Sequence, residues 1–377
     1  MTDALDWPFY DAQHREIAQR VDEWCAANPA DHDDDVDAAC RTLVRSLGAG
    51  PLLKIVGPDD GAYQVRSIAL VRERLAYHSG LADFAFAMQG LGLGPVIVAG
   101  SGEQKREFCG RVARGEAIAA FALTEPETGS DAANITMTAR RDGGAWLLDG
   151  EKTYISNGTI ADFLTVFART GEGEGAKGIS AFIVSGDAPG LSVAERIAVI
   201  APHPLARLRF AGVRGELIGQ PGAGFGIAMQ TLNIFRVGVG AAALGFARRA
   251  LDEAIRFAAA RRLGAGTLAD NAVTQAKLAD MAMAIDASAL LIARAAWQQD
   301  TQKRDNRRVA ALAKLHATEA AQKVIDAAVQ MHGGAGVTRG VKVEELYRDI
   351  RALRIYEGAS EVQRQIIARD LLKEHGQ

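Results

Sequence analysis

The chain has 377 residues, a formal net charge of -3 at pH 7 and a hydrophobic fraction of 48%. This length exceeds one ordinary hydrophobic core, so two or three domains are expected. The near balance of charge argues against a nucleic-acid partner and provides no long-range attraction for an anionic ligand. Any anion site must therefore be built locally.

The three cysteines, Cys25, Cys40 and Cys109, are odd in number and lack the spacing of metal ligands. They fit a reducing, cytoplasmic environment better than a disulfide scaffold, and no metal site is expected. The chain does not open with a basic segment followed by an apolar core, and no apolar run reaches membrane length. We therefore expect no membrane association.

Residues 1–116 carry apolar residues mainly at helical spacing, which predicts an N-terminal helical domain. An acidic, polar break falls at Asn28–Asp35 and a turn at Gly57–Gly61. The run Phe84–Val98 is apolar on all sides and contains three glycines. It is either a buried helix or a segment where a ligand passes close to the backbone, and the buried helix is favoured.

Residues 117–221 form short apolar runs bounded by Gly, Asp and Asn turns, which predicts a middle antiparallel β domain. Within it, Gly173-x-Gly175-x-x-Gly178 formally matches a dinucleotide-binding fingerprint. A strand follows instead of a helix, so no helix N-terminus is available for a pyrophosphate, and a hairpin loop is predicted.

Residues 222–377 are predicted to be helical again. Four helices with apolar faces are expected at Phe235–Arg262, at Asn271–Trp297, at Val309–His332 and from Glu361 onward. An antiparallel four-helix bundle is the economical packing of these helices.

The stretch Arg351–Leu371 places one carboxylate, Glu357, on a turn ahead of the last helix. Gly358 frees the backbone at that turn, and Ser360 with Gln363 has the spacing of a capping box. Glu357 is then fixed at its backbone and free at its tip, as a general base requires. Burial would raise its pKa and the helix dipole would lower it, and the sequence leaves open which effect is larger.

Three further motifs bear on function: Phe121–Asp131 (FALTEPETGSD), Lys152–Gly158 (KTYISNG) and Gln330–Gly336 (QMHGGAG). They offer hydroxyl donors, an aromatic wall and paired glycines that let a ligand approach the backbone. Taken singly, each is better explained as a turn, an edge strand or a helix C-cap.

In this order, however, the motifs resemble those of the acyl-CoA dehydrogenase family, and the resemblance runs from Gly100–Phe108 (GSGEQKREF) to the end of the chain. It implies an N-terminal α-helical domain, a middle β domain and a C-terminal four-helix bundle. It also implies non-covalent FAD and usually a homotetramer, or a homodimer, whose flavin is completed by a neighbouring subunit. An electron-transfer flavoprotein is the expected electron acceptor, and fatty acid or carboxylic acid catabolism the expected setting.

By the same resemblance, Glu357 looks like the base that removes the α-proton of an acyl-CoA thioester, while the β-hydrogen leaves as hydride to FAD, giving a trans-2-enoyl-CoA. The thioester oxygen would be held by the Glu357 amide together with a flavin hydroxyl. The flavin-ring positions are Phe121, Leu123, Thr124, Tyr154 and Ser156, with Ala359 and Glu361 beside the flavin. The CoA-side positions are Ser130, which we also assign to cofactor binding, Asn233, Arg236 and Gly358. The positions facing a neighbour's FAD are Arg261, Gln275, Gln330, Gly333 and Gly334.

Several residues depart from the family pattern. Asn233 replaces a usual acid on the CoA side, and Gly264 replaces an aromatic residue near the FAD adenine. Phe235 occupies the position from which some branches supply the base, and because Phe cannot take a proton, Glu357 has no competitor.

Two alternatives remain open at this stage. One is a lyase, desulfinase or decarboxylating enzyme on the same fold, which a cationic residue deep in the acyl pocket would favour; Phe84–Val98 offers none. The other is a flavin-poor scaffold subunit. Met88, Gln89 and the glycines at 90, 92 and 94 are candidates to line the acyl tail, with room for a branched or cyclic group.

Overall fold

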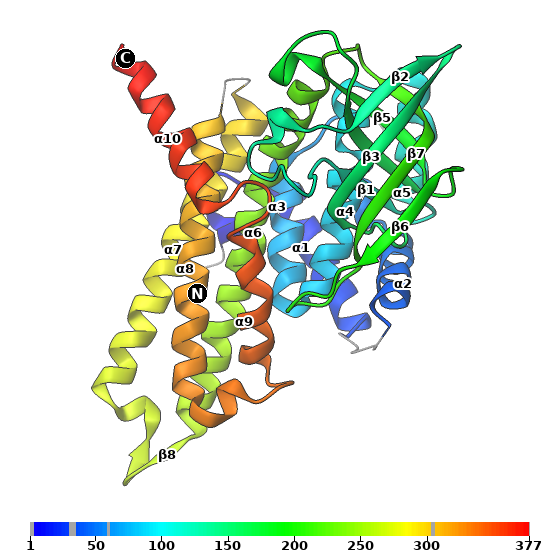
Figure 1. The fold of residues 1–377 in the computed structure, drawn as a ribbon. Coiled ribbons are helices and arrows are strands. Elements are labelled where there is room, and N and C mark those ends of the chain that lie inside the picture. Colours follow the sequence, from blue (N-terminus) through cyan, green and yellow to red (C-terminus); the bar gives the residue numbers. More distant parts are fainter. Residues whose placement is uncertain (1–3, 30–34, 59–60, 303–305, 377) are drawn as a thin grey trace. The chain divides into compact units, whose positions relative to one another are not determined.

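The computed structural model describes residues 4–29, 35–58, 61–302 and 306–376. The regular structure is helical up to Ala113 and, apart from a short two-stranded hairpin at 262–267, from Gly224 onward, and the seven strands of the main sheet lie between Ala119 and Ile218 (Figure 1). The predicted fold class is confirmed. Residues 30–34 and 59–60, within the two predicted breaks, lie outside the described residues.

The elements follow one another in three groups. The first helices are α1 (Ala12–Ala27), α2 (Val36–Ala49), α3 (Val65–His78), α4 (Gly80–Ala99) and α5 (Gly102–Ala113). The strands are β1 (Ala119–Ala122), β2 (Thr138–Asp142), β3 (Ala145–Ser156), β4 (Phe163–Arg169), β5 (Ile179–Ser185), β6 (Leu191–Arg196) and β7 (Leu205–Ile218). The last elements are α6 (Gly224–Ala260), β8 (Arg262–Leu263), β9 (Gly266–Thr267), α7 (Ala272–Thr301), α8 (Arg307–His332), α9 (Lys342–Leu353) and α10 (Ser360–Glu374).

The chain divides into two compact units, and each takes helices from the first 116 residues. The unit that we call the helical unit comprises Met1–Ala30, Gln64–Asp83 and Arg236–Gln377. The unit that we call the β unit comprises Asp31–Tyr63 and Phe84–Phe235. The residue ranges 117–221 and 222–377 predicted for the middle and C-terminal domains therefore stay a prediction from sequence.

The strands of the β unit pair in a ring. Five strands, in the order β4-β5-β7-β3-β2, pair antiparallel, and a parallel pairing between Thr138 and Arg169 closes the ring from β2 to β4. Outside the ring, β6 pairs antiparallel with β7, and β1 pairs parallel with β4, which differs from the predicted antiparallel arrangement. This closure leaves few open edges, as in a small barrel. The loop with the three spaced glycines joins β4 to β5, so the predicted hairpin, followed by a strand, is confirmed.

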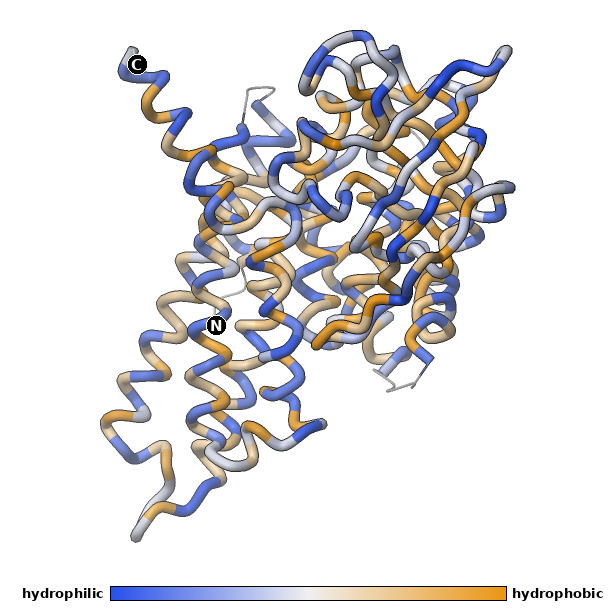
Figure 2. Tube along the Cα trace, viewed as in Figure 1, coloured by the Kyte–Doolittle hydropathy of each residue, from blue (hydrophilic) through white to orange (hydrophobic). Residues whose placement is uncertain are grey.

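Helix α8 is the central helix of the helical unit, in contact with α7, α9 and α10, while α3 contacts α1 and α7. Its buried face includes Ala317, Ala321, Val324 and Ala328, which recur every three or four residues as predicted. Figure 2 shows hydrophobic and hydrophilic residues alternating along these helices. Helix α9 was not predicted.

Two helices, Gly80–Ala99 and Gly224–Ala260, are long and apolar enough to cross a membrane by length and composition. The expectation that no apolar run reaches this length is therefore wrong. Their most apolar windows are 78% and 72% buried, which is the behaviour of core helices, so the finding is weak evidence for a membrane.

Candidate functional site

Glu357 lies on the loop between α9 and α10, in the helical unit. Its φ of 52° is left-handed, which is unusual for a side chain other than glycine, and Gly358 follows with φ of 92°. Two consecutive residues in the left-handed region turn the chain sharply. Glycine would adopt this conformation most easily at both positions, but position 357 must keep its side chain to provide the carboxylate. The predicted turn ahead of the last helix is thus confirmed.

Side chains from three helices hold the carbonyl groups of this loop. Lys314 Nζ and Gln363 Nε2 each donate to the Gly358 carbonyl at 2.8 Å, and Arg236 Nε donates to the Glu357 carbonyl at 3.4 Å. A non-glycine residue in the left-handed region persists only where its surroundings determine it. The three donors fix the backbone conformation at Glu357 and Gly358.

The predicted capping box of Ser360 and Gln363 is wrong. Helix α10 has Ala359 as its N-cap without a side-chain cap, and Ser360 Oγ instead donates to Glu319 Oε1 at 2.6 Å. Glu319 also accepts from Arg354 Nε at 3.0 Å, on the other side of the loop. Ser360 and Gln363 therefore make hydrogen bonds that hold the loop of Glu357, and neither side chain caps the end of α10.

The carboxylate of Glu357 is free at its tip. Its Oε2 atom is buried and has no hydrogen-bond partner among the described residues. Burial raises the pKa of Glu357 above its usual value, and the nearby cations Arg72, Lys314 and Arg236 only partly oppose this effect. Burial therefore has a larger effect on the pKa of Glu357 than these cations have. A raised pKa brings a carboxylate closer to the working range of a general base.

A buried ion pair, Arg72 with Asp83, stands beside this carboxylate, and sequence reasoning missed it. Arg72 lies at helical spacing between the buried Ile68 and Leu75, so a charge within an apolar stripe was the available signal. Its fork meets Asp83 through Nε and Nη2 at 2.8 and 2.9 Å. This cation comes from α3, whereas the glycine-containing segment Phe84–Val98 supplies none.

In the β unit, the motifs at Phe121–Asp131 and Lys152–Gly158 meet. Thr153 N–H donates to the Thr124 carbonyl at 2.9 Å, and the buried Lys152 Nζ donates to the Leu123 carbonyl at 2.9 Å and to Glu125 Oε1 at 2.8 Å. Glu125 in turn accepts from Thr136 N–H at 2.6 Å. The loop after β1 is therefore locked to β3.

Tyr154 occupies an irregularity of β3. The register with β7 shifts between Lys152 and Ile155, and Tyr154 has a φ of 53° and a side chain that is 63% exposed. A bulge re-aims a side chain relative to its strand. The half-buried Thr124 and Ser156 have no protein partner for their hydroxyls within the described ranges, so an aromatic wall and two unused donors are available in one motif pair.

The remaining flavin-side residues of the β unit differ in exposure. Phe121 is half-buried against Phe167, with ring centroids 5.0 Å apart, Leu123 is buried, and Ser130 is exposed. A Cβ at Gly129 would meet nothing within 4 Å, so the backbone there is open to a ligand.

The positions expected to face a neighbour's FAD all lie on the surface of the helical unit: Arg261, Gln275, Gln330, Gly333 and Gly334. Neither Gly333 nor Gly334 has an atom within 4 Å of an added Cβ. Gly264 has a φ of 58° at the turn of the β8–β9 hairpin, so a conformation that disfavours side chains explains this departure from the family pattern.

Residues near the start of α6 are divided between the units. Phe235 is fully buried in the β unit and packs edge-on against Tyr63, with ring centroids 5.4 Å apart. Arg236 is 5% exposed and directed at the Glu357 carbonyl, while Asn233 is half-buried. Arg236 thus serves the base loop in this structure; its contact with CoA, like that of Asn233, Ser130 and Gly358, stays a prediction.

The three glycines of α4 do not provide room for an acyl tail. A Cβ at Gly90 would lie 2.6 Å from the Phe235 ring, and one at Gly94 would lie 2.4 Å from Thr231 Cγ2. A Cβ at Gly92 would lie 2.6 Å from Ala119 Cβ. Their space is already filled by close packing within the β unit, so the suggestion that they accommodate a branched or cyclic group is wrong.

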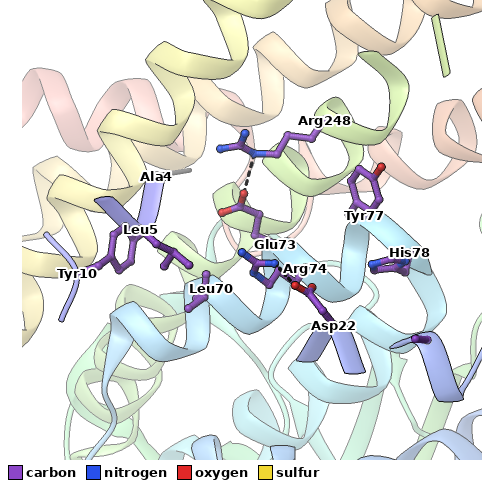
Figure 3. Close-up of a pocket in the computed structure, with 11 residues that line it drawn as sticks. Ala4, Leu5, Tyr10, Asp22, Leu70, Glu73, Arg74, Tyr77, His78 and Arg248 are labelled. Atoms are coloured by element: carbon purple, nitrogen blue, oxygen red, sulfur yellow. Dashed lines mark hydrogen bonds and ion pairs between the residues drawn. The ribbon is translucent and has the colours of Figure 1, made fainter. Parts of the chain in front are cut away.

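A separate cavity of about 520 Å³ lies in the helical unit and is lined by residues of α1, α3 and α6 and of the segment before α1 (Figure 3). Its charged side chains are paired with each other, Arg248 with Glu73 at 2.7 Å and Arg74 with Asp22 (Figure 3). Glu357 is not among the described residues that line this cavity. This cavity is therefore distinct from the candidate site.

Comparison with known proteins identifies the class to which this fold and site belong. Residues 120–213 match the acyl-CoA dehydrogenase middle domain, and residues 222–372 match the acyl-CoA dehydrogenase C-terminal domain. Short-chain specific acyl-CoA dehydrogenase of Bos taurus mitochondria is 42% identical over 288 residues, covering 75% of this chain and 70% of the relative. The 3-(aryl)acrylate reductase of Clostridium sporogenes is 34% identical over 378 residues, covering 97% and 100%.

Among solved structures, butyryl-CoA dehydrogenase from Megasphaera elsdenii superposes with a TM-score of 0.88 at 29% identity, covering 96% of this chain and 98% of the other. The chain belongs to the acyl-CoA dehydrogenase family. It is an oxidoreductase of the acyl-CoA dehydrogenase type, and its cofactor is FAD.

The side chains present suit this cofactor. The exposed ring of Tyr154, the unused Thr124 and Ser156 hydroxyls and the open backbone at Gly129 provide an aromatic face and donors for a planar heterocycle. On the helical unit, the exposed Arg261 offers the planar fork that pairs with phosphate. FAD therefore fits the donor set, and the reading as a flavin-poor scaffold is wrong.

Proposed function

We propose that this protein oxidises the Cα–Cβ bond of an acyl-CoA thioester to a trans-2-enoyl-CoA, with Glu357 as the base that removes the α-proton. The observation that carries the proposal is the Glu357 carboxylate: donors from three helices hold the carbonyl groups of Glu357 and Gly358, while Glu357 Oε2 is buried and lacks a partner among the described residues. A base needs a fixed position and an unoccupied lone pair.

Residues around the base also suit the developing negative charge. The Glu357 N–H donates to no group in the described part of the chain, so it is available to the thioester oxygen. A donor at that position stabilises enolate-like charge and acidifies the α-carbon. FAD, when bound, supplies the acceptor for the hydride that leaves the β-carbon.

The reduced enzyme must return its electrons, and we propose an electron-transfer flavoprotein as the acceptor. We also propose a homo-oligomer, a tetramer or dimer, because the surface of the helical unit carries large apolar side chains on α7. Val273, Met283 and Leu290 are 65%, 67% and 44% exposed. Exposed apolar surface of this kind is typical of an interface.

The alternative of a decarboxylating or other lyase reaction is less well supported. It requires a cation that is free to orient an acidic acyl group, whereas Arg72 is already bound through two atoms by Asp83. We therefore favour oxidation.

The test is flavin reduction. Addition of straight-chain acyl-CoAs to the anaerobic FAD-loaded enzyme should bleach the flavin band at about 450 nm. Glu357→Gln should keep that band but slow its loss by roughly two to four orders of magnitude. Glu374→Gln, an exposed carboxylate of α10, is the control and should reduce at the wild-type rate. Unchanged reduction in Glu357→Gln would assign the base elsewhere.

A further inference from the structure

Burying the ion pair of Arg72 and Asp83 costs free energy of folding, and the mechanism above gives the pair no role. Their side chains are only 1% and 5% exposed. Removing two charges from water costs several kcal/mol per ion, and apolar residues of the same size often stabilise a core equally well or better. The pair also lies among the groups that surround the candidate base, since Arg72 and Asp83 both act on the pKa of Glu357.

One end of Arg72 is unused. Asp83 occupies Nε and Nη2, whereas Nη1 is buried and has no hydrogen-bond partner among the described residues. Two groups besides Asp83 interact with this guanidinium, the Tyr356 hydroxyl, which is a neutral oxygen, and the Glu357 carboxylate. A buried donor without an acceptor costs about 1–3 kcal/mol, so a group that satisfies it would be bound with gain.

The backbone of α6 makes room for this arrangement. An added Cβ at Gly238 would lie 2.9 Å from Arg72 Cδ and 3.2 Å from Nη1. Glycine at this helical position allows the Arg72 guanidinium, including Nη1, to lie directly against α6. The unused donor is thus a built feature of three elements, α3, α4 and α6.

The charge balance determines which acceptor suits Nη1. Asp83 already matches the charge of Arg72, and Glu357 adds a second carboxylate nearby. A carboxylate on the substrate would face both anions, whereas a neutral oxygen would accept the hydrogen bond without that repulsion.

We propose that Arg72 recognises a neutral oxygen acceptor, a hydroxyl, ether or carbonyl group, on the acyl chain beyond its reacting Cα–Cβ bond. This inference rests on the proposed function, because it takes the acyl group bound beside Glu357 as the occupant. It narrows the substrate class from acyl-CoA in general to oxygen-bearing acyl-CoA thioesters.

The test compares thioesters of equal length on the FAD-loaded enzyme: hexanoyl-CoA, its 4-, 5- and 6-hydroxy and 5-oxo derivatives, and adipoyl-CoA with a terminal carboxylate. We expect at least one hydroxy or oxo derivative to exceed hexanoyl-CoA in kcat/KM by roughly ten- to a hundredfold, the worth of a hydrogen bond to a charged group.

Two variants at α3 separate recognition from folding. Arg72→Lys keeps the charge beside Asp83 but removes Nη1, so the preference for the oxygenated chain should fall to within about threefold, while the acidic limb of the pH profile stays in place. Arg74→Lys, which is paired with Asp22 at the separate cavity, is the matched control and should keep the full preference. Absorbance of bound FAD and a thermal melt check that each variant is folded.

The outcomes distinguish this inference from the proposed function. If hexanoyl-CoA is oxidised as well as every oxygenated chain, or if Arg72→Lys keeps the preference, the inference is overturned and the proposed function stands. A preference for adipoyl-CoA would overturn it in favour of an anion site. If no thioester of any kind bleaches the flavin, the proposed function fails and the inference with it.

Discussion

Lys314 Nζ donates a 2.8 Å hydrogen bond to the carbonyl of Gly358, the residue that follows the candidate base. The Lys314 side chain is fully buried, and burial lowers the pKa of its ammonium to about 8 although the Glu357 carboxylate opposes this effect. Lys314 therefore contributes both a geometric restraint on the loop and a positive charge near the base.

Lys314→Met should move the acidic limb of the rate of flavin reduction to higher pH. The pKa of Glu357 is already raised by burial, and Lys314 is one of the cations that lower it. Without this cation the carboxylate gains its proton at a higher pH, so the fraction of active base falls sooner as the solution is acidified. We also expect the rate at pH 8 to fall by about tenfold through loss of loop geometry. Stopped-flow absorbance across pH 5–9 measures both, and Lys323→Met, at an exposed position of the same helix, is the control. An acidic limb that does not move would remove Lys314 from the electrostatics of the base.

Lys152→Met should destabilise the β unit strongly. Lys152 and Glu125 are 0% and 4% exposed and paired at 2.8 Å, so the substitution leaves a buried carboxylate without its cation. Breaking a buried pair in this way costs about 3–5 kcal/mol. Urea unfolding followed by circular dichroism measures the loss, and the FAD content should fall because the loop after β1 loses its anchor. Lys177→Met, at an exposed position of the same unit, should change little; a similar loss there would mean that the effect is not one of burial.

Gly94→Ala should lower the free energy of unfolding by about 1–3 kcal/mol, because its Cβ would overlap Thr231 Cγ2. The matched control is Gly226→Ala, since Gly226 is also helical but has nothing within 4 Å of an added Cβ. That variant should be unchanged or slightly more stable through its better helix propensity. Equal stability of the two variants would show that the space at Gly94 is open after all.

Asp349→Asn should stabilise the protein at alkaline pH. Burial raises the pKa of Asp349 from 3.8 to about 7. A carboxyl group whose folded pKa is raised favours folding below the unfolded pKa, and this contribution is lost as the pH rises from about 4 through 7. Asn does not ionise, so the variant should gain about 1–2 kcal/mol over the wild type between pH 4 and 8, an amount reduced from the full shift because the residue is only half-buried. Thermal unfolding at both pH values measures it, with the exposed Asp286→Asn as control. A gain that is the same at both pH values would rule out this cause.

Local patterns predicted much of this molecule because they arise from local physics. The periodicity of the apolar residues predicted the helices of the C-terminal part, and the Glu357–Gly358 turn followed from glycine ahead of a helix. The site residues on the loop after β1 and on β3 were named through the resemblance. The structure explains why Tyr154 is accessible, because the register of β3 shifts there, and no local sequence pattern predicts this shift.

Predictions that depended on distant partners were the ones that failed. Ser360 and Gln363 have the spacing of a cap, but Glu319 and the Gly358 carbonyl compete for them successfully. The glycines of α4 are compatible with either a ligand or a neighbouring side chain, and only tertiary packing decides which. The pair of Arg72 and Asp83 joins two helices whose contact the sequence does not reveal.

Helix α8 supplies both Lys314 and Glu319. Lys314 binds the middle of the Glu357 loop, and Glu319 binds both of its ends, at Arg354 and Ser360. The loop of Glu357 and helix α8 therefore form one cooperative structural element. A chimera that takes residues 354–360 from a homologue should lose its turnover unless positions 314 and 319 are exchanged as well. Engineering that keeps the native loop should for the same reason leave α8 unchanged.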